Sequence, residues 1–276
     1  ITNRLNFLER KWGPVEPYDI TLPELLQQNN IFTHIVTDHH HYFEIGGDGY
    51  CQAFDTWDFI RGQEYDRYGS RVNKPELPSN YYGIVDEQYE LNREKFKLES
   101  DFPTPKTFAH ACDWLEENKD AKDFFLWVET FDPHEPFDCP DKYLSMYEDD
   151  YKGPHYNWSG YAPVKEPNSA TDHLRRQYAG TMTMADCWLG KLLDTLERYD
   201  MFNDTMIILT TDHGHLLGEH GFTGKNYMHN YNELAHIPLI VKLPENKRAG
   251  EEIEGLTQNI DMMPTLLDLY NIKIPE

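Results

Sequence analysis

Long hydrophobic runs are missing from this sequence of 276 residues. No apolar stretch approaches the roughly 20 residues that a helix needs to cross a bilayer, which excludes a membrane span of that kind. Positive charge is also scarce, since 25 Lys and Arg stand against 48 Asp and Glu, for a net charge of −23. Nucleic-acid binding depends on a basic surface, so this balance excludes that class of function. An anionic substrate would have to be held by local cations, either a metal ion or particular Lys, Arg and His side chains.

Cysteine is the next residue that the sequence has little of. The four cysteines are Cys51, Cys112, Cys139 and Cys187. They are widely spaced and form no Cys-x-x-Cys pair, so the sequence contains no cysteine-based zinc signature.

What the sequence does contain is an alternation of short apolar runs and longer helical patterns. This alternation is typical of an α/β fold with a mostly parallel central sheet and helices on both faces. Strands are predicted over 31–37, 124–130, 205–211 and 237–242. Helices are predicted over 21–29, 106–118, 170–199 and 261–270, the first of them opened by a capping box from Thr21 to Glu24.

Two long stretches, 42–83 and 132–168, interrupt the alternation directly after strands. They are rich in glycine, proline and aromatic residues, and loops of that length in a compact domain are usually functional or disordered. So many aromatic residues argue against disorder. Seven aromatic residues between 137 and 161 suit either a pocket for a sugar or aryl group or the packing of the loop onto the domain, and the sequence leaves both open.

Polar side chains follow three of the predicted strands, where ligands bind in open α/β sheets. The three segments are Asp38–His41, Asp132–Pro136 and Asp212–His215, and the last continues to Lys225. Asp and neutral His are ligands for divalent cations, and Lys and His are partners for anions. Each histidine taken alone is more simply a hydrogen-bonded loop residue. The residue types by themselves leave a metalloenzyme, a phosphatase and a transferase open.

A family resemblance narrows this choice. The segment 205–225, TMIILTTDHGHLLGEHGFTGK, resembles the sulfatase pattern of a hydrophobic strand ending in Asp-His-Gly, with a Lys thirteen residues after the Asp. The segments LWVETFDPHEPF and HIPLIVKLP are also similar to sulfatases, and VTDHHHYFEIGG resembles a subgroup of bacterial sulfatases. The resemblance implies an alkaline-phosphatase-like fold and a metal-dependent sulfuric ester hydrolase.

The resemblance also implies roles for particular residues. Asp212 and His213 match the Asp-His pair that holds a divalent ion, usually Ca²⁺, in the family. Lys225 matches the lysine that contacts the sulfate. His134 matches the Asp-Pro-His histidine at the sulfate pocket, as ligand or as proton donor to the leaving group.

The segment after the first strand departs from the commonest family pattern. Most sulfatases have Lys-x-His or Lys-x-x-His there, but the lysine position in this sequence is Asp38. His41 is the better match for the family histidine, and His39 is the second candidate. The departure leaves open how the positive charge of the pocket is arranged.

Other family features are missing from the sequence. Sulfatases carry a Cys or Ser in a Cys/Ser-x-Pro-x-Arg segment that is oxidised to formylglycine, and no such segment occurs here. The start ITNRLNFLE resembles sequence that follows the nucleophile helix. We therefore expect residues 1–276 to be the central part of a sulfatase catalytic domain, truncated at both ends and inactive by itself, with formylglycine in a preceding segment.

The predicted function is hydrolysis of a sulfate ester on a carbohydrate or aryl substrate, so the expected partner is a sulfated small molecule or a sulfated glycan. The alternative within the superfamily is a phosphodiesterase or phosphonate monoester hydrolase. A further alternative, from a different class, is a non-catalytic relative that retains the fold.

Overall fold

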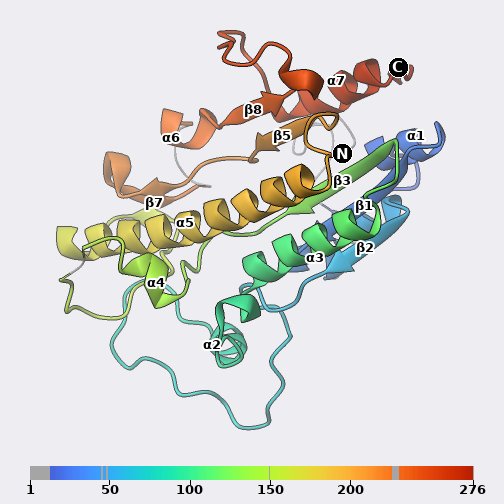
Figure 1. Ribbon diagram of the computed structural model, residues 1–276. Helices are drawn as coiled ribbons and strands as arrows, with labels where there is room; N and C mark the ends of the chain where they lie inside the picture. The colour runs from blue at the N-terminus through green and yellow to red at the C-terminus, as the bar shows by residue number, and fades with distance from the viewer. Residues whose placement is uncertain (1–12, 45, 48, 149, 226–229, 276) are drawn as a thin grey trace.

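The structure is a computed structural model that describes residues 13–44, 46–47, 49–148, 150–225 and 230–275. The N-terminal segment compared above with the sequence after a nucleophile helix falls mostly in residues 1–12, which lie outside the described residues. Figure 1 shows the arrangement of the helices and strands.

Three parallel strands form the central sheet, in the order β2 (Thr56–Phe59), β1 (Phe32–Thr37), β3 (Phe124–Glu129). In the register of this sheet, Thr37 lies opposite Phe59 on one side and Glu129 on the other. The carboxyl ends of all three strands therefore meet at one edge. Strand β2 was not predicted, because its four residues lie inside the stretch 42–83 that we assigned to a loop.

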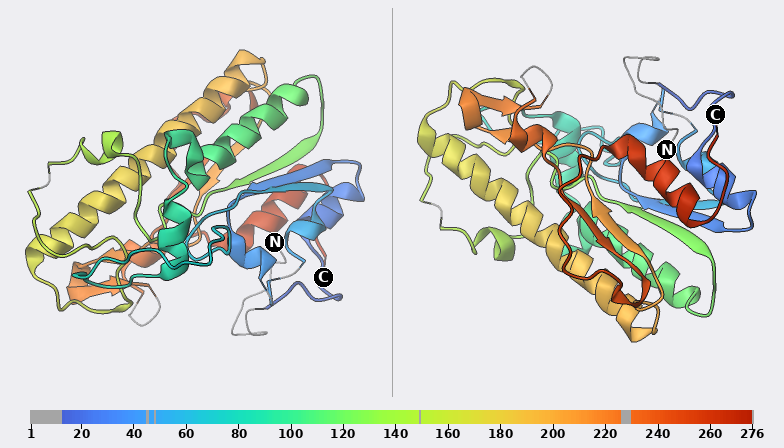
Figure 2. Two further views of the ribbon diagram at one scale, coloured as in Figure 1. Left: turned by 90° about the horizontal axis from the view of Figure 1, so that it is seen from below. Right: turned by 90° about the horizontal axis from the view of Figure 1, so that it is seen from above.

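Helices cover both faces of the sheet, as Figure 2 shows from two sides. On one face α1 (Leu22–Gln27) and α7 (Met262–Leu269) enclose a core that Phe125 joins from β3. On the other face α3 (Pro103–Glu117) and α5 (Asn168–Arg198) pack over Leu126 of the same strand. Since neighbouring residues of a strand point to opposite faces, β3 contributes to both cores. The predicted α/β fold with helices on both faces is confirmed.

The remaining strands are antiparallel. Strand β5 (Ile207–Thr210) pairs with β8 (Leu239–Lys242), and β7 (Phe222–Gly224) lies between β4 (Ala162–Pro163) and β6 (Leu216–Leu217). Within the described residues, β5 and β8 form a two-stranded sheet of their own rather than extending the parallel sheet. The strands predicted over 205–211 and 237–242 are therefore present, but their partners are each other.

The two long stretches lie against each other instead of extending separately. Tyr82 N donates to His155 O at 2.9 Å, and Ile84 N donates to Trp158 O at 2.8 Å. Between these bonds Gly83 has a φ of +68°, and a Cβ atom there would lie 2.0 Å from the Trp158 oxygen, so only glycine fits this crossing. Four of the seven loop aromatics are buried, namely Phe137, Tyr143, Tyr156 and Trp158. For these four residues, packing of the loop is the better explanation.

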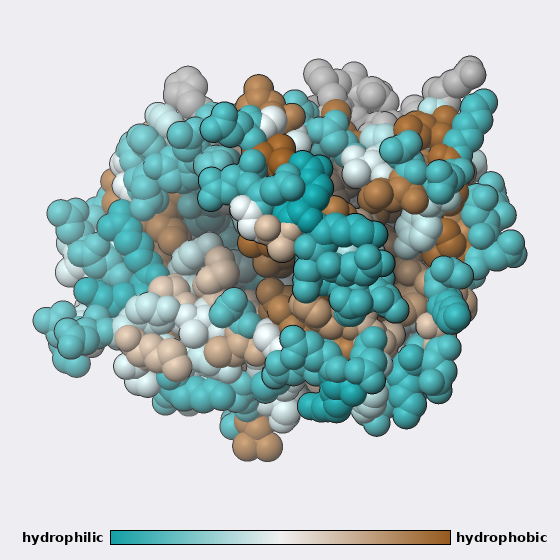
Figure 3. Space-filling view, turned by 45° about the horizontal axis from the view of Figure 1, so that its top comes forward, coloured by the Kyte–Doolittle hydropathy of each residue, from teal (hydrophilic) through white to brown (hydrophobic). Residues whose placement is uncertain are grey.

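Short helices complete the chain. They are α2 (Glu87–Arg93), α4 (Asp141–Leu144), α6 (Asn232–Ala235) and the 3₁₀ turns η1 (His40–Phe43), η2 (Cys51–Ala53), η3 (Glu99–Asp101), η4 (Glu219–Gly221), η5 (Pro244–Asn246) and η6 (Asn259–Asp261). None of the helices that the structure describes has the length and apolar character that crossing a membrane requires. Hydrophilic residues cover much of the face in Figure 3, and hydrophobic residues show both between them and at a few places on the outline.

Candidate active site

The ends of β1 and β3 bring their histidines together around one aromatic ring. The ring centroid of Phe131, two residues beyond β3, lies 5.1 Å from that of His39 and 4.1 Å from that of His134. His41, in the turn η1, lies 6.1 Å from the same ring. Three of the predicted site residues therefore surround Phe131.

Asp38 supports this arrangement through a buried carboxylate. Its side chain is fully buried and accepts a hydrogen bond from the Phe131 N–H at 2.6 Å. The Gln63 amide donates a longer hydrogen bond of 3.5 Å to the same side chain. Burial, with the nearby charge of Asp132, holds the pKa of Asp38 well above its usual range. The residue at the family's lysine position thus anchors the backbone after β3, and the positive charge of the site comes from elsewhere.

Lys225, directly after β7, supplies positive charge to the site. Its ammonium lies 5.8 Å from the ring centroid of Tyr161, whose hydroxyl donates to the carboxylate of Glu135. The same carboxylate lies 3.5 Å from His134 Nδ1 and 3.4 Å from His215 Nδ1. Glu135 is thus a buried centre that connects two histidines and a tyrosine and whose charge Lys225 faces.

Three histidines of the site, His39, His134 and His215, have lowered pKa values that favour the neutral form. Burial lowers the pKa of His134, and the charge of Lys225 acts in the same direction. Burial and neighbouring histidines lower the pKa of His39 to about 3, and burial lowers that of His215 to about 4. His134 Nδ1 donates to the Glu135 carbonyl at 2.6 Å, which leaves Nε2 free to accept a proton or a hydrogen bond.

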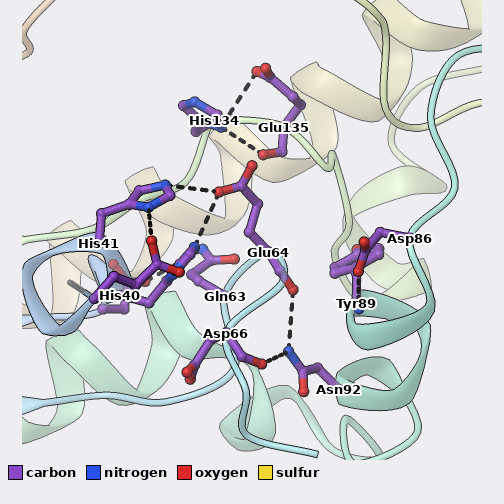
Figure 4. A network of polar contacts seen from close by, with 12 residues as sticks. His40, His41, Gln63, Glu64, Asp66, Asp86, Tyr89, Asn92, His134 and Glu135 are labelled. Carbon is purple, nitrogen blue, oxygen red and sulfur yellow. Dashed lines mark hydrogen bonds and ion pairs between the residues drawn. The ribbon is translucent and has the colours of Figure 1, made fainter. Parts of the chain in front are cut away.

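His41 differs because two carboxylates face it. Burial opposes its protonation, but hydrogen bonds to Glu64 and Glu44 raise the pKa of His41. Figure 4 shows the rings of His40 and His41 turned toward the Glu64 carboxylate, which comes from the loop after β2. His41 is therefore the histidine of this site that carries positive charge most readily.

Asp212 and His213 follow β5 and lie at the same edge of the molecule. The charge of Asp212 acts on His39, on Lys225 and on Glu129 at the end of β3. His213 Nδ1 donates to the Gly214 carbonyl at 2.9 Å, so Nε2 presents a lone pair 3.3 Å from Asp212 Oδ2. Ligand atoms at right angles around a Ca²⁺ ion with bonds of about 2.3–2.6 Å lie about 3.3–3.7 Å apart. The pair thus fits two adjacent positions of a divalent ion, but supplies only two of the six to eight ligands that Ca²⁺ takes.

His39, His41 and His134 follow strands of the parallel sheet. Lys225 and Asp212, the latter beside His213, follow the antiparallel strands β7 and β5, and their charges act on His134 and His39. Five residues of the site were not predicted from the sequence: His40, Glu64, Glu135, Tyr161 and His215. His40, Glu135 and His215 stand inside the segments already noted after strands, so their positions were the available signal. Glu64 and Tyr161 come from the two long loops, where no local pattern marks an individual residue.

Comparison with known proteins identifies the family of the chain. The family model described as Sulfatase matches residues 5–272. The multifunctional alkaline phosphatase superfamily protein PehA of Trinickia caryophylli is 30% identical over 207 residues, covering 62% of this chain and 40% of that protein. The N-acetylglucosamine-6-O-sulfatase of Bacteroides thetaiotaomicron is 36% identical over 100 residues, covering 36% of this chain and 18% of that protein.

Solved structures share the fold. A protein solved in complex with its substrate D-glucosamine-2-N,6-O-disulfate superimposes with a TM-score of 0.66 at 20% identity, over 96% of this chain and 63% of that one. The phosphonate monoester hydrolase of Agrobacterium radiobacter gives a TM-score of 0.71 at 18% identity, over 94% of this chain and 60% of that one. The chain thus spans less than half the length of the two curated relatives and under two thirds of these structures. Because the Sulfatase family model matches residues 5–272, the chain belongs to the sulfatase family.

Proposed function

We propose that a protein carrying this chain hydrolyses sulfate esters, with the site at the ends of β1, β3, β5 and β7 as its active site. The observation that carries the proposal is the convergence of Lys225 and His134 on Glu135 in a chain of the sulfatase family. A cation and a hydrogen-bonding imidazole are what a site needs to hold a sulfuryl group as charge develops on its oxygens.

Lys225 is assigned to the sulfate oxygens. Burial lowers the pKa of Lys225 and the charges of Glu135, Asp212 and Glu64 act against this effect, so the lysine lies in a partly desolvated place that carboxylates face. In such a place its interaction with an anion is stronger than at an open surface. Glu135 sets the position of the neighbouring groups, because it is buried and holds the hydroxyl of Tyr161.

His134 is assigned to the leaving group or to a sulfate oxygen. Its free Nε2 accepts a hydrogen bond in the neutral form and donates one after protonation. Burial lowers the pKa of His39 to about 3, whereas hydrogen bonds to Glu64 and Glu44 raise the pKa of His41 against the effect of burial. The two histidines therefore differ in their surroundings, since His39 packs against Phe131 and His41 faces two carboxylates.

Asp212 and His213 are assigned to a divalent cation, for which we propose Ca²⁺. When bound, such an ion polarises sulfuryl oxygens and an attacking group. The assignment is supported by the 3.3 Å between His213 Nε2 and Asp212 Oδ2, a separation that suits two adjacent ligand positions, and by the Nδ1 contact with the Gly214 carbonyl, which leaves the lone pair on Nε2. The attacking group itself would be a formylglycine outside these residues, because residues 1–276 contain no Cys/Ser-x-Pro-x-Arg segment.

A sulfated sugar is the substrate class that we propose. The support is the name of the Bacteroides thetaiotaomicron relative, an N-acetylglucosamine-6-O-sulfatase, and the sulfated glucosamine bound in the similar structure. Tyr65 and Tyr161, both beside the site, offer aromatic faces of the kind that pack against sugar rings.

The test compares matched model esters with the full-length protein. Release of sulfate from aryl and N-acetylglucosamine sulfates should exceed release of phosphate from the corresponding phosphodiesters and phosphonate monoesters. The multifunctional relative and the phosphonate monoester hydrolase neighbour make the second reaction the alternative outcome. Faster phosphodiester or phosphonate cleavage would replace the proposed function, and no turnover of any ester by the matured protein would favour a non-catalytic relative.

A further inference from the structure

We propose that His40, His41 and Glu64 form a binding site for a transition-metal ion, with Zn²⁺ as the best match, separate from the pair Asp212 and His213. One nitrogen of each ring and one oxygen of Glu64 lie within 4.8 Å of one another. Glu64 Oε2 is 3.2 Å from His40 Nε2 and 3.3 Å from His41 Nε2. Around a tetrahedral Zn²⁺ with bonds of about 2.0–2.1 Å, ligand atoms lie about 3.3–3.4 Å apart. These two distances are therefore close to the edges of a zinc coordination tetrahedron.

A second carboxylate lies behind the two rings. Glu44 Oε2 is 3.0 Å from His41 Nδ1, and Glu44 Oε1 is 3.4 Å from His40 Nδ1. Metal-binding histidines usually donate their other ring N–H to a carboxylate, which fixes the tautomer and turns the lone pair toward the metal. Glu44 occupies this place for His41, to which it is hydrogen-bonded, and lies near Nδ1 of His40 without a hydrogen bond to it.

Hydrogen bonds alone account poorly for the cluster. Glu64 Oε2 faces Nε2 of both rings, so hydrogen bonds alone would place two N–H groups on the same oxygen. His40 Nδ1 would then be buried without a hydrogen-bond partner among the described residues, beside a ring whose centroid is 4.0 Å away. A metal ion on the Nε2 side takes up the lone pairs of both Nε2 atoms, while Nδ1–H of His41 still donates to Glu44.

Glu64 is held in place by backbone contacts. Its φ of +44° lies in the left-handed region that residues other than glycine rarely adopt. Asn92 Nδ2 donates to the Glu64 carbonyl at 3.2 Å and to the Asp66 carbonyl at 2.7 Å, and both bonds appear in Figure 4. Such a conformation persists only where its surroundings fix it, and it often occurs at ligand sites.

The cluster leaves room for an outside ligand. His40 and Glu64 are buried, with side-chain exposures of 2% and 7%, but His41 is 24% exposed. Two histidines and one carboxylate with an open position resemble catalytic rather than closed structural zinc sites. Lys225 and Glu64 also interact electrostatically, and the positive charge of Lys225 opposes the binding of Zn²⁺. Because of this opposing charge, the affinity for Zn²⁺ depends on the negative charges of both Glu64 and Glu44.

The test is metal binding by the full-length protein after removal of its metals. Titration with Zn²⁺ should show one equivalent that is lost in Glu64→Gln and in His40→Gln. Glu44→Gln should retain the site with about 10- to 100-fold weaker affinity, because it removes a partner behind the ligands. Excess Ca²⁺ should not displace the ion, since two of the three ligands are nitrogen. His110→Gln is the matched control, because His110 pairs with Asp58 at an exposed place outside the cluster and should bind Zn²⁺ as the parent does.

Three outcomes would overturn the proposal. The first is wild-type Zn²⁺ affinity and stoichiometry in both Glu64→Gln and His40→Gln. The second is ready displacement of the bound Zn²⁺ by Ca²⁺. The third is a parent protein that does not bind one equivalent of Zn²⁺. If the buried substitutions prevent folding, anomalous scattering at the zinc edge from crystals of the Zn²⁺-loaded parent decides the matter. Density between the three ligand atoms supports the site, and density only elsewhere contradicts it. None of these readouts requires sulfatase activity.

Discussion

Lys225 places a positive charge in a molecule that is otherwise strongly acidic. Lys225→Ala in the full-length protein should lower kcat for sulfate esters about 100- to 1,000-fold, because it removes a cation that acts on the developing charge of the transition state. Folding should be little affected, since the lysine is at a strand end rather than in a hydrophobic core. Steady-state kinetics and thermal unfolding measure the two effects separately.

Lys165→Ala is the control for this substitution, because Lys165 is an exposed lysine near β4. It should leave kcat within about twofold of the parent value, as expected of a surface change. Equal losses in the two variants would remove Lys225 from the site.

Asp132 gives the stability of the molecule a pH dependence. Burial raises its pKa to about 7, against the opposing hydrogen bond from Gln63. A carboxyl whose pKa is higher in the folded state binds its proton more tightly there than in the unfolded state. Its contribution to the free energy of unfolding is therefore complete below pH ~4 and is lost as the pH rises through 7. Asp132→Asn should therefore gain stability relative to the parent from pH 5 to pH 8, by on the order of 1–3 kcal/mol.

Urea unfolding at several pH values tests this difference. Glu129 is also buried, with a pKa raised to about 7, so the parent slope should be reduced in Asp132→Asn but not abolished. A parent and a variant with parallel pH profiles would show that Asp132 is ionised throughout.

At the scale of elements, α1 depends on its first turn. Thr21 is fully buried, its hydroxyl accepts the Glu24 N–H at 3.4 Å, and the Glu24 carboxylate accepts the Thr21 N–H at 3.1 Å. Thr21→Ala should lower the free energy of unfolding by about 1 kcal/mol, because amide groups at the helix start lose their partner. Thr21→Ser retains the hydroxyl and should lose less than half of that amount in the same denaturation experiment.

Elements with a local sequence signal could be predicted from the sequence. The capping box, the strands β1 and β3 and the long helix α5 carry local signals, and each was found within a few residues of its observed bounds. The polar residues after strands were found for the same reason, since their positions follow from the alternation. Strand β2 carries no such signal, because four residues within a loop rich in aromatics show no recognisable period.

The contacts between residues of the site were harder to predict from the sequence than the position of the site at the strand ends. Asp38 stands where the family has a lysine, and only the fold shows that its carboxylate turns inward to the Phe131 N–H. Glu64 reaches His40 across 24 residues of sequence, a contact that depends on the path of the loop after β2. Contacts of this kind arise from tertiary structure and have no counterpart in local sequence.

For the molecule as a whole, the groups assigned to the proposed site suit the stabilisation of charge, and residues 1–276 contain no Cys/Ser-x-Pro-x-Arg segment. We expect the polypeptide of residues 1–276 to show no measurable sulfate-ester hydrolysis, because stabilising groups without a nucleophile give only residual rates. Sulfate release should be compared with that of the matured full-length protein under the same conditions. Turnover by residues 1–276 at a comparable rate would mean that a residue of this chain attacks the ester.

The crossing of the two long loops at Gly83 also limits how this protein can change in evolution. Because the backbones from Asn80 to Ile84 and from His155 to Trp158 are bonded to each other, neither loop has an independent conformation to exchange. A chimera that takes one loop from a relative would meet an unmatched partner, whereas one that takes both would carry over the crossing intact. Substrate preference, as far as it resides in these loops, is thus inherited as a pair of segments that lie more than 70 residues apart in the sequence.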